Sequence, residues 1–148
     1  MPDVNHAKKW LAFAQNDYDV AIALEANHWP KFLEHICYHC QQSTEKALKA
    51  VLAYHEVDIP KTHNIARLID ECKKYDTSVQ MDMKISKIMT DYSTITRYPD
   101  DADTELIDSD ATLALKYAKL TLDMVRQSLN LSKEEIIQAD EAAKESPK

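Results

Sequence analysis

The 148-residue sequence contains no glycine at all and only five prolines. Without glycine, the chain has no glycine-rich loop of the kind that holds phosphate in P-loop proteins or in dinucleotide-binding folds. It also lacks the residue best suited to tight hairpin turns and to the left-handed ends of helices. These absences exclude two common classes of nucleotide site and favour long helices over sheets.

An excess of basic residues is absent as well, because the formal net charge is −7. A general nucleic-acid-binding protein is usually basic, so any contact with nucleic acid must come from a local patch. No apolar run is long enough to span a membrane, and the first ten residues, MPDVNHAKKW, have no hydrophobic signal core. The three cysteines, an odd number, do not suggest a disulfide framework. We therefore expect a cytoplasmic protein with no membrane association.

What the sequence does contain is apolar residues at helical spacing along most of its length. The spacing predicts helices over residues 5–27, from Pro30 to about 56, and over residues 62–74, 79–96 and 108–130. Thr62 is the predicted cap of the third helix, and Ser132 with Glu135 has the spacing of a capping box that starts a last short helix. The sequence thus predicts an all-α chain. We expect a helical bundle over residues 1–131, and a short helix with a frayed tail over residues 132–148.

The stretch EHICYHCQQSTEKALKA, residues 34–50, carries two cysteines at Cys-x-x-Cys spacing together with two histidines. On a helix each residue turns by about 100°, so His35 and His39 lie on one face while Cys37 and Cys40 lie on the other. A tetrahedral metal site needs all four ligands to converge. We therefore predict no metal at this motif and interpret both thiols as small apolar core residues.

The polar face of the same helix carries His35, His39, Gln42, Lys46 and Lys49. One interpretation, which the spacing alone favours, is a solvated helix face. The other is a face that lines a groove or a subunit interface, where imidazole, amide and ammonium groups hold phosphate or RNA. Two histidines four residues apart are also compatible with a metal, but the sequence offers no HExxH motif and no identifiable third ligand.

Four stretches together resemble the HEPN family, the nucleotide-binding domains of higher eukaryotes and prokaryotes. CYHCQQSTEKALKAVL resembles the second-helix signature of that family, and WLAFAQNDYDVAIAL resembles its first helix, with Asp17 in an A..D...A setting. KTHNIARLIDECKK resembles the segment after the second helix, led by His63, and YSTITRYPDDADTE resembles the Arg-Tyr-Pro segment before the last long helix. The resemblance covers most of the chain, from about Trp10 to Leu129.

The resemblance implies a four- to five-helix up-and-down bundle that forms a homodimer, with a site at the dimer cleft near the arginine-containing segment. Many members of the family are metal-independent RNases, often the toxin half of a toxin–antitoxin pair whose partner is a small nucleotidyltransferase. In the active members an arginine is followed, after four to six residues, by a histidine. Arginine suits the scissile phosphate, and histidine suits transfer of the 2′-hydroxyl proton.

This chain departs from that pattern after Arg97. None of the next eight residues is a histidine, and no histidine follows His63 anywhere in the sequence. The acidic run from Asp100 to Asp110 also repels an RNA backbone near Arg97. Three histidines on other helices remain as candidate bases: His35, His39 and His63.

Arg97 has three interpretations. As a catalytic residue it contacts the scissile phosphate. As a structural residue it pairs with Asp17 across the core, which fixes the register of two helices at a cost in desolvation. As a binding residue it holds a nucleotide phosphate together with lysines of the second helix. The full set of predicted nucleotide- or RNA-binding residues is Arg97, Tyr98, Lys46, Lys49, His39 and Gln42.

We therefore predict a nucleotide- or RNA-binding module that needs no cofactor and accompanies a separate nucleotidyltransferase in a toxin–antitoxin-type system. The first alternative is a metal-independent RNase toxin that uses Arg97 with a non-standard base. The second alternative is a non-catalytic interaction domain whose acidic surface docks a basic partner. The missing histidine favours the two non-enzymatic interpretations.

Overall fold

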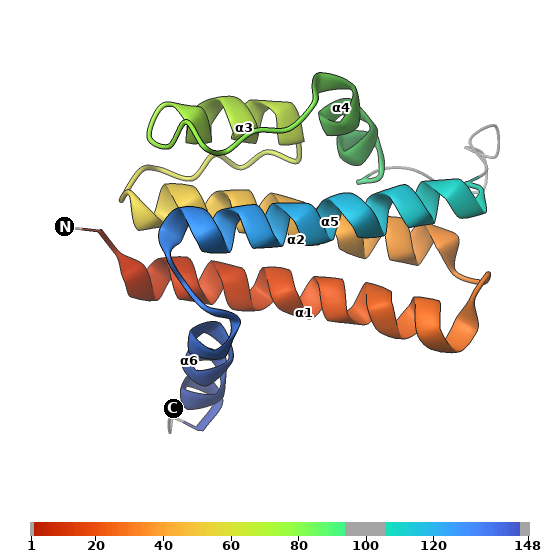
Figure 1. The fold of residues 1–148 in the computed structure, drawn as a ribbon, viewed down its shortest axis with the longest axis horizontal. Helices are drawn as coiled ribbons and strands as arrows, with labels where there is room; N and C mark the ends of the chain where they lie inside the picture. The colour runs from red at the N-terminus through yellow and green to blue at the C-terminus, as the bar shows by residue number, and fades with distance from the viewer. Residues whose placement is uncertain (1, 94–105, 146–148) are drawn as a thin grey trace.

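A computed structural model describes residues 2–93 and 106–145 of the chain. All regular structure within these residues is helical: α1 Val4–His28, α2 Leu33–Tyr54, α3 Ile65–Lys73, α4 Met83–Asp91, α5 Asp108–Leu129 and α6 Lys133–Glu145. Figure 1 shows the long helices α1, α2 and α5 side by side, with the short helices α3 and α4 on a further side of α2. The prediction of an all-α bundle is confirmed. Within the same residues, no helix combines the length and apolarity that crossing a membrane requires.

α2 is the central helix of the bundle, because it contacts α1, α5, α3 and α4. Fourteen of its 22 residues are buried, and several of these are polar or charged. A buried polar group needs a hydrogen-bond partner, and a buried charge needs a counter-charge. The central position of α2 therefore requires its neighbours to supply partners for its polar side chains.

The apolar spacing that predicted a helix over residues 108–130 corresponds to a buried stripe along α5. Its buried positions are Ala111, Ala114, Leu115, Ala118, Leu122, Val125 and Leu129. On α1 the buried residues are four alanines and Leu11, whereas Trp10 and Leu24 are only partly buried. The small alanine side chains let the backbones of α1 and α2 approach closely, so that polar side chains of the two helices come within bonding distance.

The start of α3 corrects one prediction. Asn64, not Thr62, caps this helix, because Asn64 Oδ1 accepts a hydrogen bond from the backbone N–H of Arg67 at 3.1 Å. Thr62 Oγ1 instead accepts from the backbone N–H of Asn64, also at 3.1 Å. The side chain directly before the first helical residue reaches the free amides of the first turn, and Thr62 lies too far upstream to do so.

α4 is shorter than the helix predicted over residues 79–96. The carboxylate of Asp82 accepts hydrogen bonds from the backbone N–H groups of Lys84 at 2.8 Å and Ile85 at 3.3 Å, so the helix begins at Met83. It ends at Asp91. Met83 occupies the first helical position and is 69% exposed.

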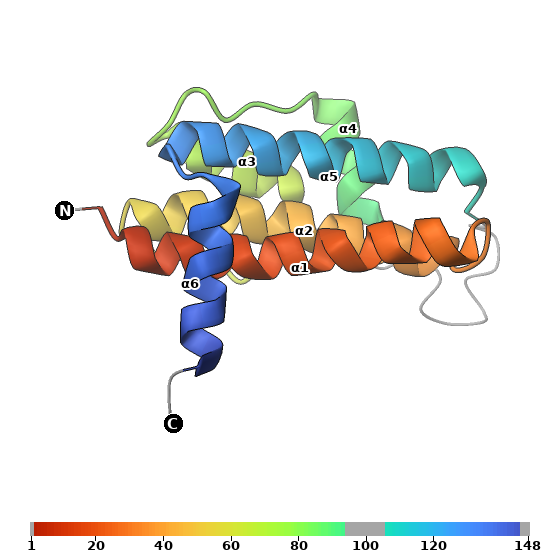
Figure 2. The same cartoon turned by 60° about the horizontal axis from the view of Figure 1, so that its bottom comes forward.

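α6 begins at the predicted capping box. Ser132 Oγ accepts from the backbone N–H of Glu135 at 3.1 Å, and the carboxylate of Glu135 accepts from the backbone N–H of Ser132 at 3.4 Å. The helix continues to Glu145, although the sequence predicted a frayed tail there. Figure 2 shows α6 crossing α1 at a steep angle and projecting beyond the three long helices.

Candidate functional site

The polar face of α2 meets a carboxylate that comes from α1. The side chain of Asp17 is 13% exposed, and its two oxygens contact different residues of α2. His39 Nδ1 lies 2.9 Å from Oδ1, and Lys46 Nζ lies 2.6 Å from Oδ2. Burial alone would raise the pKa of Asp17, but the hydrogen bonds from His39 and Lys46 outweigh burial and hold the pKa below its ordinary value. One ionised carboxylate therefore fixes an imidazole and an ammonium group side by side.

Both partners of Asp17 remain partly open to solvent. The side chain of His39 is 29% exposed and that of Lys46 is 28% exposed. An ammonium group has three donors, and the ion pair with Asp17 uses one of them. The Nε2 atom of His39 has no hydrogen-bond partner among the residues that the structure describes. The ammonium of Lys46 can therefore offer further hydrogen bonds to an anion, and Nε2 of His39 is open to a ligand beside it.

A second carboxylate, Glu45, is buried further along α2, with its side chain 5% exposed. Its Oε1 lies 2.7 Å from Nδ1 of His63, which comes from the segment between α2 and α3, and it also accepts from Gln41 Nε2 at 3.2 Å. Its Oε2 accepts from Lys49 Nζ at 3.1 Å. The same ammonium lies 5.7 Å from the ring centroid of Trp10. Glu45 thus joins α2 to the segment that leads into α3.

The structure separates the residues that were predicted to bind a ligand. It places His39, Gln42 and Lys46 on the partly open side of α2. It places Lys49 in the interior, 8% exposed and occupied by Glu45, so this ammonium is not presented to a ligand. Arg97 and Tyr98 lie outside the described residues, and the predicted pair between Arg97 and Asp17 stays a prediction.

Replacing Asp17 by asparagine tests the contact between α1 and α2. We expect the free energy of unfolding at pH 7 to fall by about 1.5–3 kcal/mol, the usual value of a hydrogen bond to a charged group. Because folding lowers the pKa of Asp17, its stabilising effect is present above the unfolded value of 3.8 and is lost as the pH falls through the folded value. The difference between wild type and Asp17→Asn should therefore shrink below about pH 4.

Urea denaturation at a series of pH values measures this difference. Asp19→Asn is the matched control, because Asp19 is an exposed aspartate on the same helix. A gap between wild type and Asp17→Asn that stays constant from neutral to acidic pH would contradict the assignment.

The cysteines of the Cys-x-x-Cys motif lie in the core and carry no chemistry. Cys37 and Cys40 are both fully buried, on the opposite side of α2 from His35 and His39. Burial raises the pKa of Cys37 to about 12 and raises that of Cys40 as well. Only a thiolate is a nucleophile or a metal ligand, so both thiols are inert at neutral pH. Their interpretation as core residues is confirmed, and no three His, Cys, Asp or Glu side chains in the described part of the chain are grouped to hold a metal.

A hydrogen bond that the sequence did not predict joins α4 to α5. The hydroxyl of Tyr92, directly after α4, donates to Oδ1 of Asp110 in the first turn of α5 at 3.1 Å. The pKa of Tyr92 lies well above its ordinary value, chiefly because the side chain is buried. The nearby Cys37 and Asp110 raise this pKa further. The tyrosine is therefore a permanent donor, and the bond links the end of α4 to the first turn of α5.

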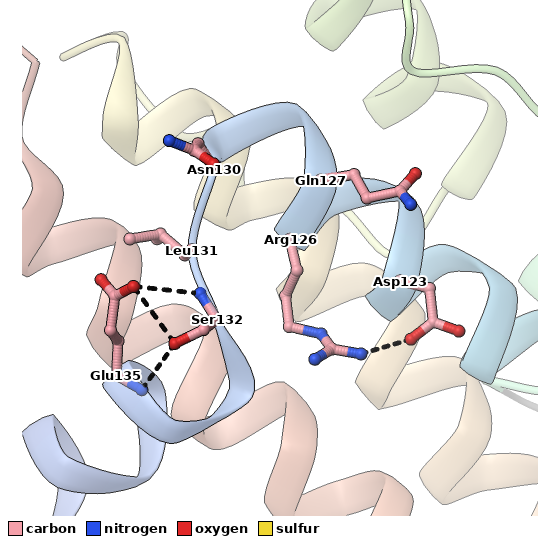
Figure 3. Close-up of a pocket in the computed structure, with 7 residues that line it drawn as sticks. All are labelled: Asp123, Arg126, Gln127, Asn130, Leu131, Ser132 and Glu135. Atoms are coloured by element: carbon pink, nitrogen blue, oxygen red, sulfur yellow. Dashed lines mark hydrogen bonds and ion pairs between the residues drawn. The ribbon is translucent and has the colours of Figure 1, made fainter.

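A polar pocket of about 450 Å³ lies at a different place, where α5 turns into α6 (Figure 3). Its lining residues are Asp123, Arg126, Gln127, Asn130, Leu131, Ser132 and Glu135. Arg126 Nη2 donates to Asp123, whereas the buried Nε of Arg126 has no partner within the described residues. Two carboxylates and one guanidinium line this pocket, and Asp123 already pairs with the guanidinium, so the pocket does not suit a phosphate. The pocket contains none of the predicted binding residues.

Comparison with known proteins gives one match. Neither the search of curated proteins nor the search of solved structures found any. The family model described as HEPN domain, in contrast, matches residues 7–129, which run from the first turns of α1 to the end of α5. This interval includes Asp17 and Glu45, and among the helices of the described residues only α6 lies wholly outside it. The chain therefore belongs to the HEPN domain family.

Proposed function

We propose that this HEPN domain binds nucleotides or RNA through His39 and Lys46 on α2. The observation that carries the proposal is the shared carboxylate of Asp17, which fixes both side chains while leaving each more than a quarter exposed. A phosphate oxygen accepts hydrogen bonds from an ammonium group, and from an imidazole ring when both of its nitrogens carry a proton, and such charge-assisted bonds are short and strong. Gln42 lies between the two residues on the same face and supplies an amide.

We further propose that the domain acts in the cytoplasm as a homodimer and accompanies a separate nucleotidyltransferase, as the HEPN resemblance implies. The outer face of α1 supports a subunit contact, because Phe13 and Val20 lie two turns apart on it and are 58% and 42% exposed. Sedimentation at high protein concentration tests the dimer. A single species of about 17.0 kDa, the mass of one chain, would contradict it.

Nucleotide titration tests the binding function. We expect nucleoside mono- and triphosphates to raise the Tm of the wild-type protein with concentration. Lys46→Gln should weaken this binding by roughly 10- to 100-fold, because it removes one charge-assisted hydrogen bond. Lys116→Gln is the matched control, since Lys116 is an exposed lysine on α5 without an ion pair in the described part of the chain. A Tm that no nucleotide and no RNA changes would contradict the function.

One observation favours a second candidate, a metal-independent RNase. His63 is 66% exposed, and Glu45 fixes its Nδ1, so that Nε2 is directed away from the carboxylate and is available for proton transfer. Arg97 is the proposed phosphate contact. Cleavage of structured RNA in EDTA by wild type, lost in both Arg97→Ala and His63→Ala, would support this candidate. Intact RNA in all three reactions would contradict the RNase candidate and leave nucleotide or RNA binding as the remaining function.

A further inference from the structure

α3 and α4 enclose a groove of about 430 Å³ on the side of α2 away from α1. Its lining residues are Asn64, Ala66, Met83, Lys84, Lys87 and Thr90. The two lysines, one turn apart on α4, are the only charged residues among them. The pocket at the α5–α6 turn, by contrast, has two carboxylates in its wall. On a chain of net charge −7, the α3–α4 groove is a local concentration of positive charge.

The charges of these two lysines are not neutralised by the fold. Lys84 and Lys87 are exposed, and neither forms a hydrogen bond or ion pair through its side chain with any residue in the ranges 2–93 and 106–145. Asp82, the carboxylate nearest to Lys84 in the sequence, is directed to the backbone amides at the start of α4. Asp91, the carboxylate nearest to Lys87, lies one turn further along α4 and does not line the groove. Asp70 lies one turn along α3 from Ala66 and does not line the groove. An anionic ligand in the groove would therefore meet two available ammonium groups.

The other lining residues suit a nucleic-acid strand better than a compact anion. The amide nitrogen of Asn64 has no partner among the described residues, because the cap of α3 uses only its oxygen. Met83 stands exposed at the edge of the groove, and its flexible apolar side chain offers a surface against which a base can pack. Ammonium donors for phosphates next to an apolar surface for bases are the combination that single-stranded nucleic acids require.

A row of hydrogen-bonded polar residues runs from Gln42, which lies between His39 and Lys46 on α2, to the residue before Asn64. Gln42 on the partly open face of α2 donates to Gln41 Oε1 at 2.8 Å, and Gln41 Nε2 donates to the backbone oxygen of His63 at 3.4 Å. The next residue, Asn64, lines the groove. The two places lie on different helices.

We propose that the α3–α4 groove binds the phosphate backbone of single-stranded RNA, with Lys84 and Lys87 contacting neighbouring phosphates. The proposal rests on the proposed nucleotide- or RNA-binding function and narrows its ligand to an oligonucleotide. Residues three apart on a helix have their Cβ atoms about 5–6 Å from each other, so both side chains extend to the same stretch of backbone. Such contacts carry no base specificity.

The test compares two double variants that remove the same charge. Lys84→Gln/Lys87→Gln alters the groove, whereas Lys116→Gln/Lys133→Gln alters two exposed lysines on α5 and α6. Binding of a fluorescent uridine decamer is followed by anisotropy at several salt concentrations. Each phosphate contact to a single strand contributes about 0.7 to the salt slope, so the groove variant should lose about 1.4 of slope and roughly 25-fold in affinity near 0.1 M salt. The control variant should bind as the wild type does.

Each other outcome overturns the proposal in a distinguishable way. If both double variants bind the decamer equally well, the backbone does not lie in the groove, and titration with uridine monophosphate still tests the His39–Lys46 pair separately. If wild type binds no decamer, an RNA strand is not the ligand, whatever the mononucleotide result. If the wild-type protein prefers a polyglutamate peptide to the decamer and the groove variant no longer binds that peptide, the groove serves an acidic protein instead.

Discussion

Glu45→Ala is expected to lower the free energy of unfolding by about 3–5 kcal/mol, the usual cost of leaving one partner of a buried ion pair alone. Glu45 accepts from His63, Gln41 and Lys49, and its side chain is 5% exposed. Its removal leaves the ammonium of Lys49, with a side chain only 10% exposed, without a counter-charge. Urea denaturation followed by helical circular dichroism measures the loss.

Two further variants separate charge from packing in this experiment. Glu141→Ala, an exposed acid on α6, should change stability by no more than about 0.5 kcal/mol. The double variant Glu45→Leu/Lys49→Met should recover most of the loss, since apolar residues in place of both partners leave no unpaired charge. If the double variant is as unstable as Glu45→Ala, the loss comes from packing and the ion-pair explanation is wrong.

Leu48→Ala is expected to have the second large effect, a loss of about 2–5 kcal/mol. Leu48 is fully buried on the central helix, so its truncation both removes apolar contacts and leaves a cavity. Leu120→Ala makes the same chemical change on α5 at a side chain that is 50% exposed, and it should cost far less. Chemical denaturation of both variants gives the comparison, and equal losses would contradict the assignment of Leu48 to the core.

The sequence was sufficient for the fold because its apolar spacing is regular. Every predicted stripe position on α5 is buried, and the four stretches that resemble HEPN domains lie within the interval that the family model matches. The starts of the helices were less predictable, because two or three polar residues often precede a helix and each of them could cap it. Only the backbone geometry determines which side chain reaches the free amides of the first turn. Asn64 and Asp82 were selected in this way at the starts of α3 and α4.

The partners of Asp17 show why a site is harder to predict than a fold. The sequence offered a cation as the partner of Asp17, but several cations were available, and only the packing of α1 on α2 brings His39 and Lys46 to this carboxylate. A usable signal was present, because these two residues lie seven apart and therefore share one face of α2. Likewise, the spacing of Glu45 and Lys49 on one helix allows an ion pair that the sequence can predict. The burial of this ion pair depends on residues from other elements, such as Trp10 of α1, and the sequence of α2 does not show it.

The Asp17 contact has a consequence for how selective the proposed binding is. In the free domain the carboxylate already pairs with one of the three donors of Lys46, so a phosphate that uses the remaining donors lies close to a second negative charge. A polyanion that offers charge alone gains little there, because the charge of the ammonium is already partly neutralised before the polyanion arrives. A ligand must therefore add further contacts in order to bind. Asp17 in this way discriminates against weak, purely electrostatic partners.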